Sequence, residues 1–293
     1  MKSITRFQPE ALGTTDSLGS PKVISVMSGK GGSGKSVVAH NLALAAGQSG
    51  LKTLVVDFDW RLGSMHVLAN AAVSSGIDDV IYNGAYISDC AVNIGLNTEL
   101  LASASVISER DWPTDAEVFE FIQHCKETLF TYDLIVIDTP SGIQSQLRSI
   151  ASASDALLLI VNPELTTIAD SYGLLKWLLQ ADSNLNIYLL LNRVLGAKEA
   201  TDIAERFTSL TNRFLNCKPQ TIAFIQEDRQ MRQAIARQRA VVAMAPESVI
   251  ANQFQTLLSR LEKKVFTNKT AVRNLGNVQT TMNPITEYTD KTK

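Results

Sequence analysis

The sequence is poor in cysteine, in histidine and in long apolar runs. Its three cysteines, Cys90, Cys125 and Cys217, are odd in number and lie far apart. This spacing argues against a disulfide scaffold and against a Cys-ligated metal or iron–sulfur cluster. The three histidines show no ligand spacing either. No apolar run reaches the roughly 20 residues that a membrane span requires, and no signal peptide opens the sequence. We therefore expect a cytoplasmic protein in a reducing compartment.

The sequence also lacks an excess of charge of either sign. A formal net charge of −2 gives no global attraction to nucleic acid or to anionic membranes, so any such binding must be local. With 45% hydrophobic and 19% charged residues, the composition is that of a globular protein. The 293 residues are enough for one large α/β domain or two small ones.

The main motif is a glycine-rich segment between an apolar, β-branched run at 23–26 and a helix-like stretch that begins near residue 35. Glycines allow backbone N–H groups to face an anion, and a helix N-terminus adds partial positive charge. Lys35 would reach the β- and γ-phosphates, and the Ser36 hydroxyl would bind Mg²⁺. The predicted nucleotide-binding residues are Gly29, Lys30, Gly31, Gly32, Ser33, Gly34, Lys35 and Ser36.

Strand-like apolar runs alternate with amphipathic helical segments through most of the chain. The runs lie at 23–26, 52–58, 132–139, 155–161, 187–191 and 221–225, and the helical segments at 114–129, 167–179, 198–214 and 246–265. This alternation predicts an α/β fold, namely a doubly wound, mostly parallel sheet with helices on both faces. We expect a P-loop ATPase domain at 22–265, a flexible N-terminal extension at 1–21 and a disordered polar tail at 266–293.

Aspartates follow two of the predicted strands. Asp57 and Asp59 end the run at 52–58, and Asp138 ends the run at 132–139. Ligands of open parallel sheets bind outside the C-terminal ends of the strands, so these carboxylates should converge near the γ-phosphate. Asp138 fits the role of holding Mg²⁺, directly or through a water. A surface aspartate at a strand end, or a helix N-cap, is the alternative for Asp138.

With these motifs together, the sequence resembles the MinD/ParA group of P-loop ATPases, and within it the FlhG/FleN branch of flagellar number regulators. The loop at 29–36 matches the deviant pattern K-G-G-x-G-K-[ST], and V-V-D-F-D at 55–59 matches the switch I segment. Asn162 to Tyr172 is similar to the P-E-P-T-A-I-T-D-A-Y segment of that branch, and Leu191 to Val194 also matches. The resemblance covers about residues 22 to 265.

The resemblance implies roles for individual residues. Lys30 would contact phosphate across an ATP-sandwich homodimer, and Asp59 would position the attacking water. Asp57 would support switch I and the magnesium shell, and Asn192 would hydrogen-bond the adenine base. Lys30, Lys35 and Asp59 are thus the catalytic candidates, and Ser36, Asp57 and Asp138 are the magnesium candidates. For Asn192, an asparagine that caps the following helix is the alternative.

The implied function is a slow, partner-stimulated, Mg²⁺-dependent ATPase that acts as a dimerisation switch in flagellar regulation. A flagellar GTPase or a transcription regulator would be its partner, and recruitment to the membrane or a cell pole would be peripheral. Two alternatives stay open. A ParA-type DNA-partitioning ATPase is less favoured, because the P-Q-G-N segment of that branch is absent. A poorly hydrolysing adaptor is suggested by Trp-Arg-Leu-Gly at 60–63, which departs from the switch I pattern of the family.

Two further segments have two interpretations each. The helix predicted at 246–265 is either the last core-packing helix, which we favour, or a peripheral membrane anchor. It carries few cations, and an interfacial anchor usually carries many. The basic set Arg229, Arg232, Arg237 and Arg239 forms either a solvated helix face or a surface for DNA or a protein partner.

Overall fold

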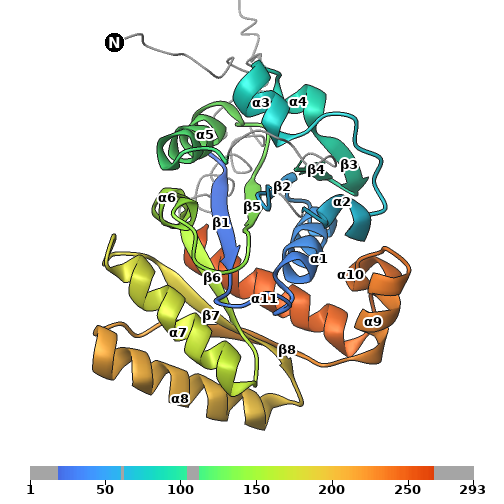
Figure 1. Cartoon of the computed structure of the whole chain (residues 1–293). Helices are drawn as coiled ribbons and strands as arrows, with labels where there is room; N and C mark the ends of the chain where they lie inside the picture. Colours follow the sequence, from blue (N-terminus) through green and yellow to red (C-terminus); the bar gives the residue numbers. More distant parts are fainter. Residues whose placement is uncertain (1–18, 61–62, 104–111, 267–293) are drawn as a thin grey trace, which may run out of the picture.

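The computed structural model describes residues 19–60, 63–103 and 112–266, which form a three-layer α/β domain (Figure 1). Its middle layer is an eight-stranded sheet in the order β3-β4-β2-β5-β1-β6-β7-β8. Neighbouring strands are parallel except for β3 and β4, which are antiparallel. The strands are β1 (Lys22–Met27), β2 (Thr53–Asp57), β3 (Val92–Gly95), β4 (Thr98–Leu101), β5 (Leu134–Asp138), β6 (Ala156–Val161), β7 (Ile187–Val194) and β8 (Gln220–Gln226).

Helices cover both faces of this sheet. In Figure 1, α5 to α8 lie on one side and α1 with α11 on the other. The helices are α1 (Lys35–Gln48), α2 (Met65–Leu68), α3 (Ile77–Asn83), α4 (Ile87–Cys90), α5 (Asp115–Thr128), α6 (Gln146–Ala153), α7 (Leu165–Leu179), α8 (Ala197–Leu215), α9 (Arg229–Ala236), α10 (Val241–Met244) and α11 (Val249–Val265).

The two apolar layers explain why the central strands read as continuous apolar runs. Successive side chains of a strand point to opposite faces. On β2, Leu54 packs in the cluster under α5 to α8, whereas its neighbour Val55 packs in the cluster under α1 and α11. Ile135 and Val136 on β5 divide in the same way. Because both faces are covered, no position in these strands requires a polar residue.

The predicted fold class is confirmed, and each of the six predicted strands is present. The sequence pattern did not predict β3 and β4, each four residues long, or the short helices α2, α3, α4, α6, α9 and α10. Helices of four to eight residues are too short to show a clear helical periodicity, and β3 and β4 lack the continuous apolar run that marks the buried strands. β3 is moreover a half-buried edge strand that pairs antiparallel to β4, outside the parallel alternation.

The last helix is a core helix, as we favoured. Phe254, Leu257 and Leu261 of α11 are fully buried, and α11 packs against α1 and β8. Ser248 caps its N-terminus by accepting a hydrogen bond from the Ala251 N–H at 3.2 Å. Among the described residues no helix has both the length and the apolar character needed to cross a membrane.

The predicted extension and tail lie almost wholly outside the described residues. Two residues at the boundaries differ from the prediction. Pro21, assigned to the flexible extension, is buried, and Phe266, assigned to the polar tail, is 5% exposed and packs in the same apolar cluster as α11. The packed domain therefore extends one residue beyond the predicted end at 265, because the aromatic ring completes that cluster.

Candidate nucleotide-binding site

The glycine-rich loop links β1 to α1 at the C-terminal edge of the sheet, and a serine at its start organises it. The Ser28 hydroxyl donates to the Lys30 carbonyl at 2.8 Å. It accepts hydrogen bonds from the Ser33 hydroxyl at 2.7 Å and from the Lys35 ammonium at 3.2 Å. The Lys35 ammonium is therefore held inside the loop. The sequence pattern did not identify Ser28, because the motif begins at the following residue.

Geometry requires glycine at several positions of the loop, as Gly34 and Gly29 illustrate. Gly34 precedes α1 with a φ of 94°, in the left-handed region that glycine adopts without strain. Gly29 lies against the backbone of α7, where a Cβ atom would lie 2.1 Å from the Asp170 carbonyl carbon. The loop thus rests directly on α7, and only glycine fits at position 29.

The predicted aspartates do converge beside the loop. Asp57 and Asp138 are register partners at the ends of β2 and β5, and the Phe58 N–H donates to the Asp138 carbonyl at 2.8 Å. Burial raises the pKa of Asp138 to about 8, helped by the nearby Asp57 and Asp59 and opposed by Ser36 and Lys35. Burial likewise raises the pKa of Asp57 to about 6.

The same carboxylates affect the pKa of Lys35. Burial lowers the pKa of the Lys35 ammonium, and Asp138 and Asp59 act in the opposite direction. The site therefore places one buried cation among three carboxylates, in surroundings where charge is costly. A bound phosphate would offset the charge of Lys35, and a divalent cation would offset the charges of the carboxylates.

The oxygen donors near Lys35 fit magnesium. Asp138 is fully buried, and its Oδ1 atom has no hydrogen-bond partner among the described residues. A hydroxyl and carboxylates are the hard oxygen ligands that Mg²⁺ prefers. No group of three or more His, Cys, Asp or Glu in the described chain would hold a metal ion by itself. Phosphate oxygens and waters would have to complete the coordination shell around Ser36 and Asp138.

Asp57 differs from Asp138 because both of its carboxylate oxygens accept backbone hydrogen bonds. Its Oδ1 accepts the Asp59 N–H at 3.1 Å and its Oδ2 accepts the Met65 N–H at 3.0 Å. The carboxylate thus holds both ends of the segment that carries Asp59. This agrees with support of switch I, and its contribution to the magnesium shell stays a prediction.

The unusual tryptophan of that segment is a core residue. Trp60 is 4% exposed, and its ring packs edge-to-face on Tyr82 of α3, with centroids 5.7 Å apart. Arg61 and Leu62, the next two residues of the departure, lie outside the described residues. The first part of the predicted switch I segment is therefore anchored by an apolar contact with α3.

Lys30, the additional lysine of the loop, has other surroundings than Lys35. Lys30 is exposed, and its Nζ donates to the Thr166 hydroxyl at 3.1 Å, in the first turn of α7. Leu165 next to that threonine is 80% exposed. Two lysines of one loop thus face different surroundings, Lys35 inward and Lys30 at the outer surface.

A cavity of about 280 Å³ adjoins the loop at Gly32 and Gly34. Asn192, at the end of β7, lines it, and its Nδ2 donates to the Ser33 carbonyl at 2.8 Å. Val37 and Val38 of α1 and Met231 of α9 give the cavity apolar walls suited to a flat base. We call this the base cavity, and the hydrogen bond from Asn192 to an adenine base stays a prediction.

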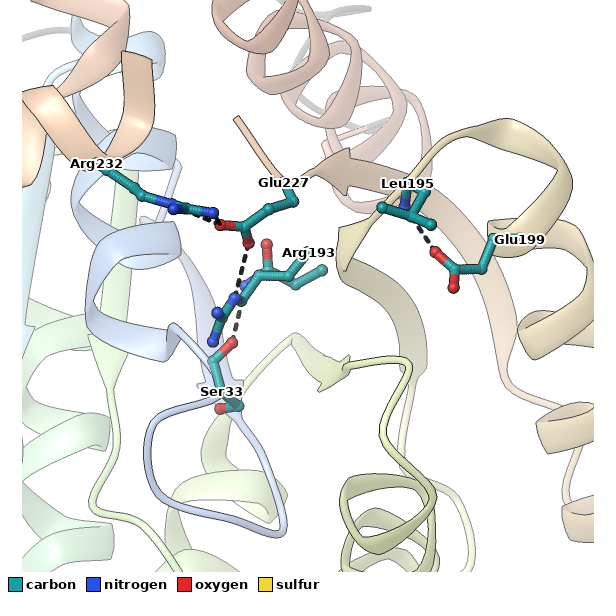
Figure 2. Close-up of polar contacts among 7 residues, drawn as sticks. Ser33, Arg193, Leu195, Glu199, Glu227 and Arg232 are labelled. Carbon is teal, nitrogen blue, oxygen red and sulfur yellow. Dashed lines mark hydrogen bonds and ion pairs between the residues drawn. The ribbon is translucent and has the colours of Figure 1, made fainter. Parts of the chain in front are cut away.

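A three-residue ion-pair network forms the outer wall of this base cavity (Figure 2). Glu227 accepts from Arg193 at 2.9 Å through one carboxylate oxygen and from Arg232 at 2.7 Å through the other. The Arg193 hydrogen bond lowers the pKa of Glu227, and Arg232 adds to the effect. Sequence reasoning did not find this network, because its members come from β7, the loop after β8, and α9.

The four arginines of the predicted basic set, at 229–239, differ in their surroundings. All four arginines are exposed, but Arg232 lines the base cavity and Arg239 lines another cavity. For Arg229 and Arg237, the structure agrees with a solvated face.

Comparison with known proteins places the fold and the site in a family context. The family described as AAA domain matches residues 21–191. The antiactivator FleN of Pseudomonas aeruginosa is 28% identical over 241 residues, 82% of this chain and 86% of that protein. The flagellum site-determining protein YlxH of Helicobacter pylori is 23% identical over 262 residues, 89% of this chain and 88% of its own. Among solved structures, the septum site-determining protein MinD from Pyrococcus horikoshii, complexed with Mg-ADP, is 26% identical with a TM-score of 0.67 and covers 83% of this chain and 96% of that one.

Proposed function

The chain belongs to the AAA domain family of ATP-binding P-loop proteins, and we propose that it hydrolyses ATP as a homodimerising switch. The observation that carries the proposal is the division of labour between two lysines of one loop. Lys35 is buried among carboxylates, whereas Lys30 reaches outward to the first turn of α7. An outward ammonium beside a phosphate site is suited to a nucleotide held by a second copy.

The chemistry assigned to the site needs positioning and charge stabilisation more than covalent work. Loop N–H groups and Lys35 would bind the β- and γ-phosphates, and Ser36 and Asp138 would hold Mg²⁺. The magnesium ion, when bound, neutralises charge that develops on the phosphate oxygens. Asp59 would orient the attacking water and is itself oriented by the hydrogen bond from its N–H to Asp57.

Exposed apolar side chains around the site support a second copy as the partner of this edge. Leu165 and Leu195 are 80% and 84% exposed, and Ile143 is 56% exposed. Each follows the C-terminal end of a strand, so all three lie on the edge of the sheet that carries the P-loop. Burying them between two copies would stabilise a closed dimer by removing apolar area from water.

The cellular role that we propose is control of flagellar number or placement. Two relatives, an antiactivator and a flagellum site-determining protein, support it. A flagellar GTPase or a transcription regulator would read the closed dimer. The protein would act from the cytoplasm, with peripheral recruitment to the membrane or a cell pole.

A poorly hydrolysing adaptor is the second candidate. The buried Trp60 favours it, because a switch I segment anchored in the core is less free to rearrange around a γ-phosphate. The rate of phosphate release, with and without candidate partners, separates an adaptor from an ATPase.

Sedimentation velocity with saturating MgATP tests the switch. The unmodified protein and Asp59→Ala should dimerise, with Asp59→Ala remaining dimeric after the unmodified protein has hydrolysed its ATP. Lys35→Ala should lose ATP binding. Lys30→Ala should still bind ATP yet stay monomeric, whereas Lys176→Ala, at the far end of α7, should behave as the unmodified protein.

A monomeric Asp59→Ala protein at saturating ATP would contradict the dimer, and an unimpaired Lys30→Ala dimer would remove its proposed basis. Dimer formation that requires DNA, with a steep salt dependence, would favour the ParA-type alternative instead.

A further inference from the structure

The end of β7 contains a bulge that places one arginine at the base cavity. Asn192 pairs with Ile225 of β8 and Val194 pairs with Gln226, so Arg193 is an extra residue on β7. Its φ of 60° lies in the left-handed region, which a residue other than glycine adopts at a cost in strain. Bulges of this kind redirect a side chain. Asn192 and Val194 on either side are buried, whereas Arg193 is exposed and lines the base cavity.

Glu227 is fixed beside this bulge. Its N–H donates to the Val194 carbonyl at 2.9 Å. Its carboxylate lies between the guanidinium groups of Arg193 and Arg232 (Figure 2). Arg232 donates to the Oε1 atom through Nε at 2.9 Å and through Nη2 at 2.7 Å. Arg193 donates to the Oε2 atom through Nε at 2.9 Å. Contacts from β7 and from α9 thus set the position of this carboxylate.

These hydrogen bonds leave the carboxylate little capacity for a ligand. An ionised carboxylate has about four acceptor positions, two on each oxygen. Arg232 occupies both positions of Oε1, and Arg193 occupies one position of Oε2. Asp228, the other carboxylate among the described residues that line the cavity, caps α9 by accepting the Gln230 N–H at 2.6 Å. Glu227 therefore offers one open acceptor position to an occupant, and not two side by side.

Adenine and guanine make different demands on such a group. Guanine presents two adjacent donors, N1–H and the N2 amine, which together match both oxygens of a free carboxylate. Its O6 and N7 acceptors match a free guanidinium. Adenine presents a single donor group, the N6 amine, next to the N1 acceptor, so it gains less from either charged group. A carboxylate and guanidinium groups that bind each other therefore leave guanine without its best partners.

From this geometry we propose that Arg193 and Arg232, by occupying the Glu227 carboxylate, make the base cavity select adenine over guanine nucleotides. The inference deepens the proposed ATPase function and rests on it. A guanine base would have to separate an arginine from Glu227 before it gained the carboxylate, which lowers the affinity for guanine alone. The three side chains are thus specificity-determining residues, whereas the P-loop binds the phosphates that both nucleotides share.

Isothermal titration calorimetry of the full chain with MgADP and with MgGDP tests the selectivity without hydrolysis. The unmodified protein should bind ADP about tenfold or more tightly than GDP, as expected for the loss of one or two hydrogen bonds. Arg232→Ala removes both donors from Oε1 and should reduce this ratio roughly fivefold or more, chiefly by tightening GDP binding. Arg232→Lys keeps a cation at this position and should retain most of the selectivity.

Two further variants locate the effect. Arg237→Ala removes an exposed arginine outside the base cavity and should leave both affinities unchanged. Adding Glu227→Gln to Arg232→Ala removes the freed carboxylate, so GDP binding should weaken again. Thermal melts verify that each variant folds. The ratio of the ADP and GDP affinities decides the matter, because a merely structural effect would change both affinities together.

Equal binding of ADP and GDP by the unmodified protein would overturn the proposal, as would unchanged selectivity in the Arg232→Ala protein. Neither result would affect the proposed ATP-driven dimerisation, which sedimentation of the Lys30→Ala protein tests separately. Absence of binding of either nucleotide would overturn the proposed function itself, and the selectivity with it.

Discussion

The side-chain Nδ2 of Asn192 donates a 2.8 Å hydrogen bond to the Ser33 carbonyl, across 159 residues of sequence. One asparagine at the end of β7 thus supports the P-loop and lines the base cavity at the same time. If Asn192 binds the base as predicted, loop conformation and base recognition are coupled through this residue.

Asn192→Ala should lower ATP affinity ten- to thirtyfold. The variant loses the bond to the P-loop and a donor for the base, each contributing about 1 kcal/mol. Fluorescent-nucleotide titration measures the effect. Asn186→Ala, which removes an exposed hydrogen bond to the Asp155 carbonyl just before β7, is the control and should bind ATP normally. Equal affinities for the two variants would contradict the role of Asn192.

Gly29→Ala should destabilise the fold by about 1–3 kcal/mol and abolish nucleotide binding. The added methyl group would overlap the α7 backbone at Asp170, so the loop must move away from the helix. Gly173→Ala on the same helix has open space around it and should be neutral or slightly stabilising, since alanine favours helix. Urea unfolding and ATP titration of both variants check the contrast.

Glu227→Gln should weaken ATP binding a few-fold with little change in stability. The substitution removes the charge that joins Arg193 to Arg232, and both arginines are largely exposed, so the pairs contribute less than about 1 kcal/mol each. Calorimetry at low and high salt should show the difference from the unmodified protein shrinking as salt rises. Glu199→Gln, which alters the contact to the Leu195 N–H outside the base cavity, should not affect affinity.

His40 should make the fold less stable in mild acid. Burial lowers its pKa to about 4 in the folded chain against 6.5 ordinarily, so the unfolded chain binds a proton first as pH falls. The contribution to stability is complete above pH 6.5 and is lost progressively toward pH 4. Between pH 7.5 and 5 the loss is about 2 kcal/mol. Urea unfolding of the unmodified protein and His40→Gln should show a smaller pH effect in the variant.

Phe254→Ala should cost about 3–5 kcal/mol of folding free energy, because the ring of this α11 residue is fully buried. Val249→Ala, at a position 62% exposed on the same helix, should change stability by less than about 0.5 kcal/mol. Denaturant midpoints of the two variants decide between a core helix and a membrane anchor. Similar small effects from both would mean that α11 is not packed as described.

Much of the fold was predictable because its signals are local. Continuous apolar runs identified six strands, and amphipathic segments, together with the helix-like stretch after the glycine-rich loop, identified the helices α1, α5, α7, α8 and α11. The hairpin of β3 and β4 was not predictable, because edge strands of four residues carry too little pattern. The catalytic roles of Lys30 and Asp59 follow from family resemblance and stay predictions.

The sequence by itself determined the glycine-rich loop, the lysine that the loop encloses and the aspartates that end the buried strands. These features depend on residues close together in the chain and on the rule that parallel strands end at one edge of the sheet. Only the tertiary structure decided that both oxygens of Asp57 hold backbone, whereas Oδ1 of Asp138 has no hydrogen-bond partner among the described residues. It also decided the base cavity, because its walls come from segments that only folding brings together.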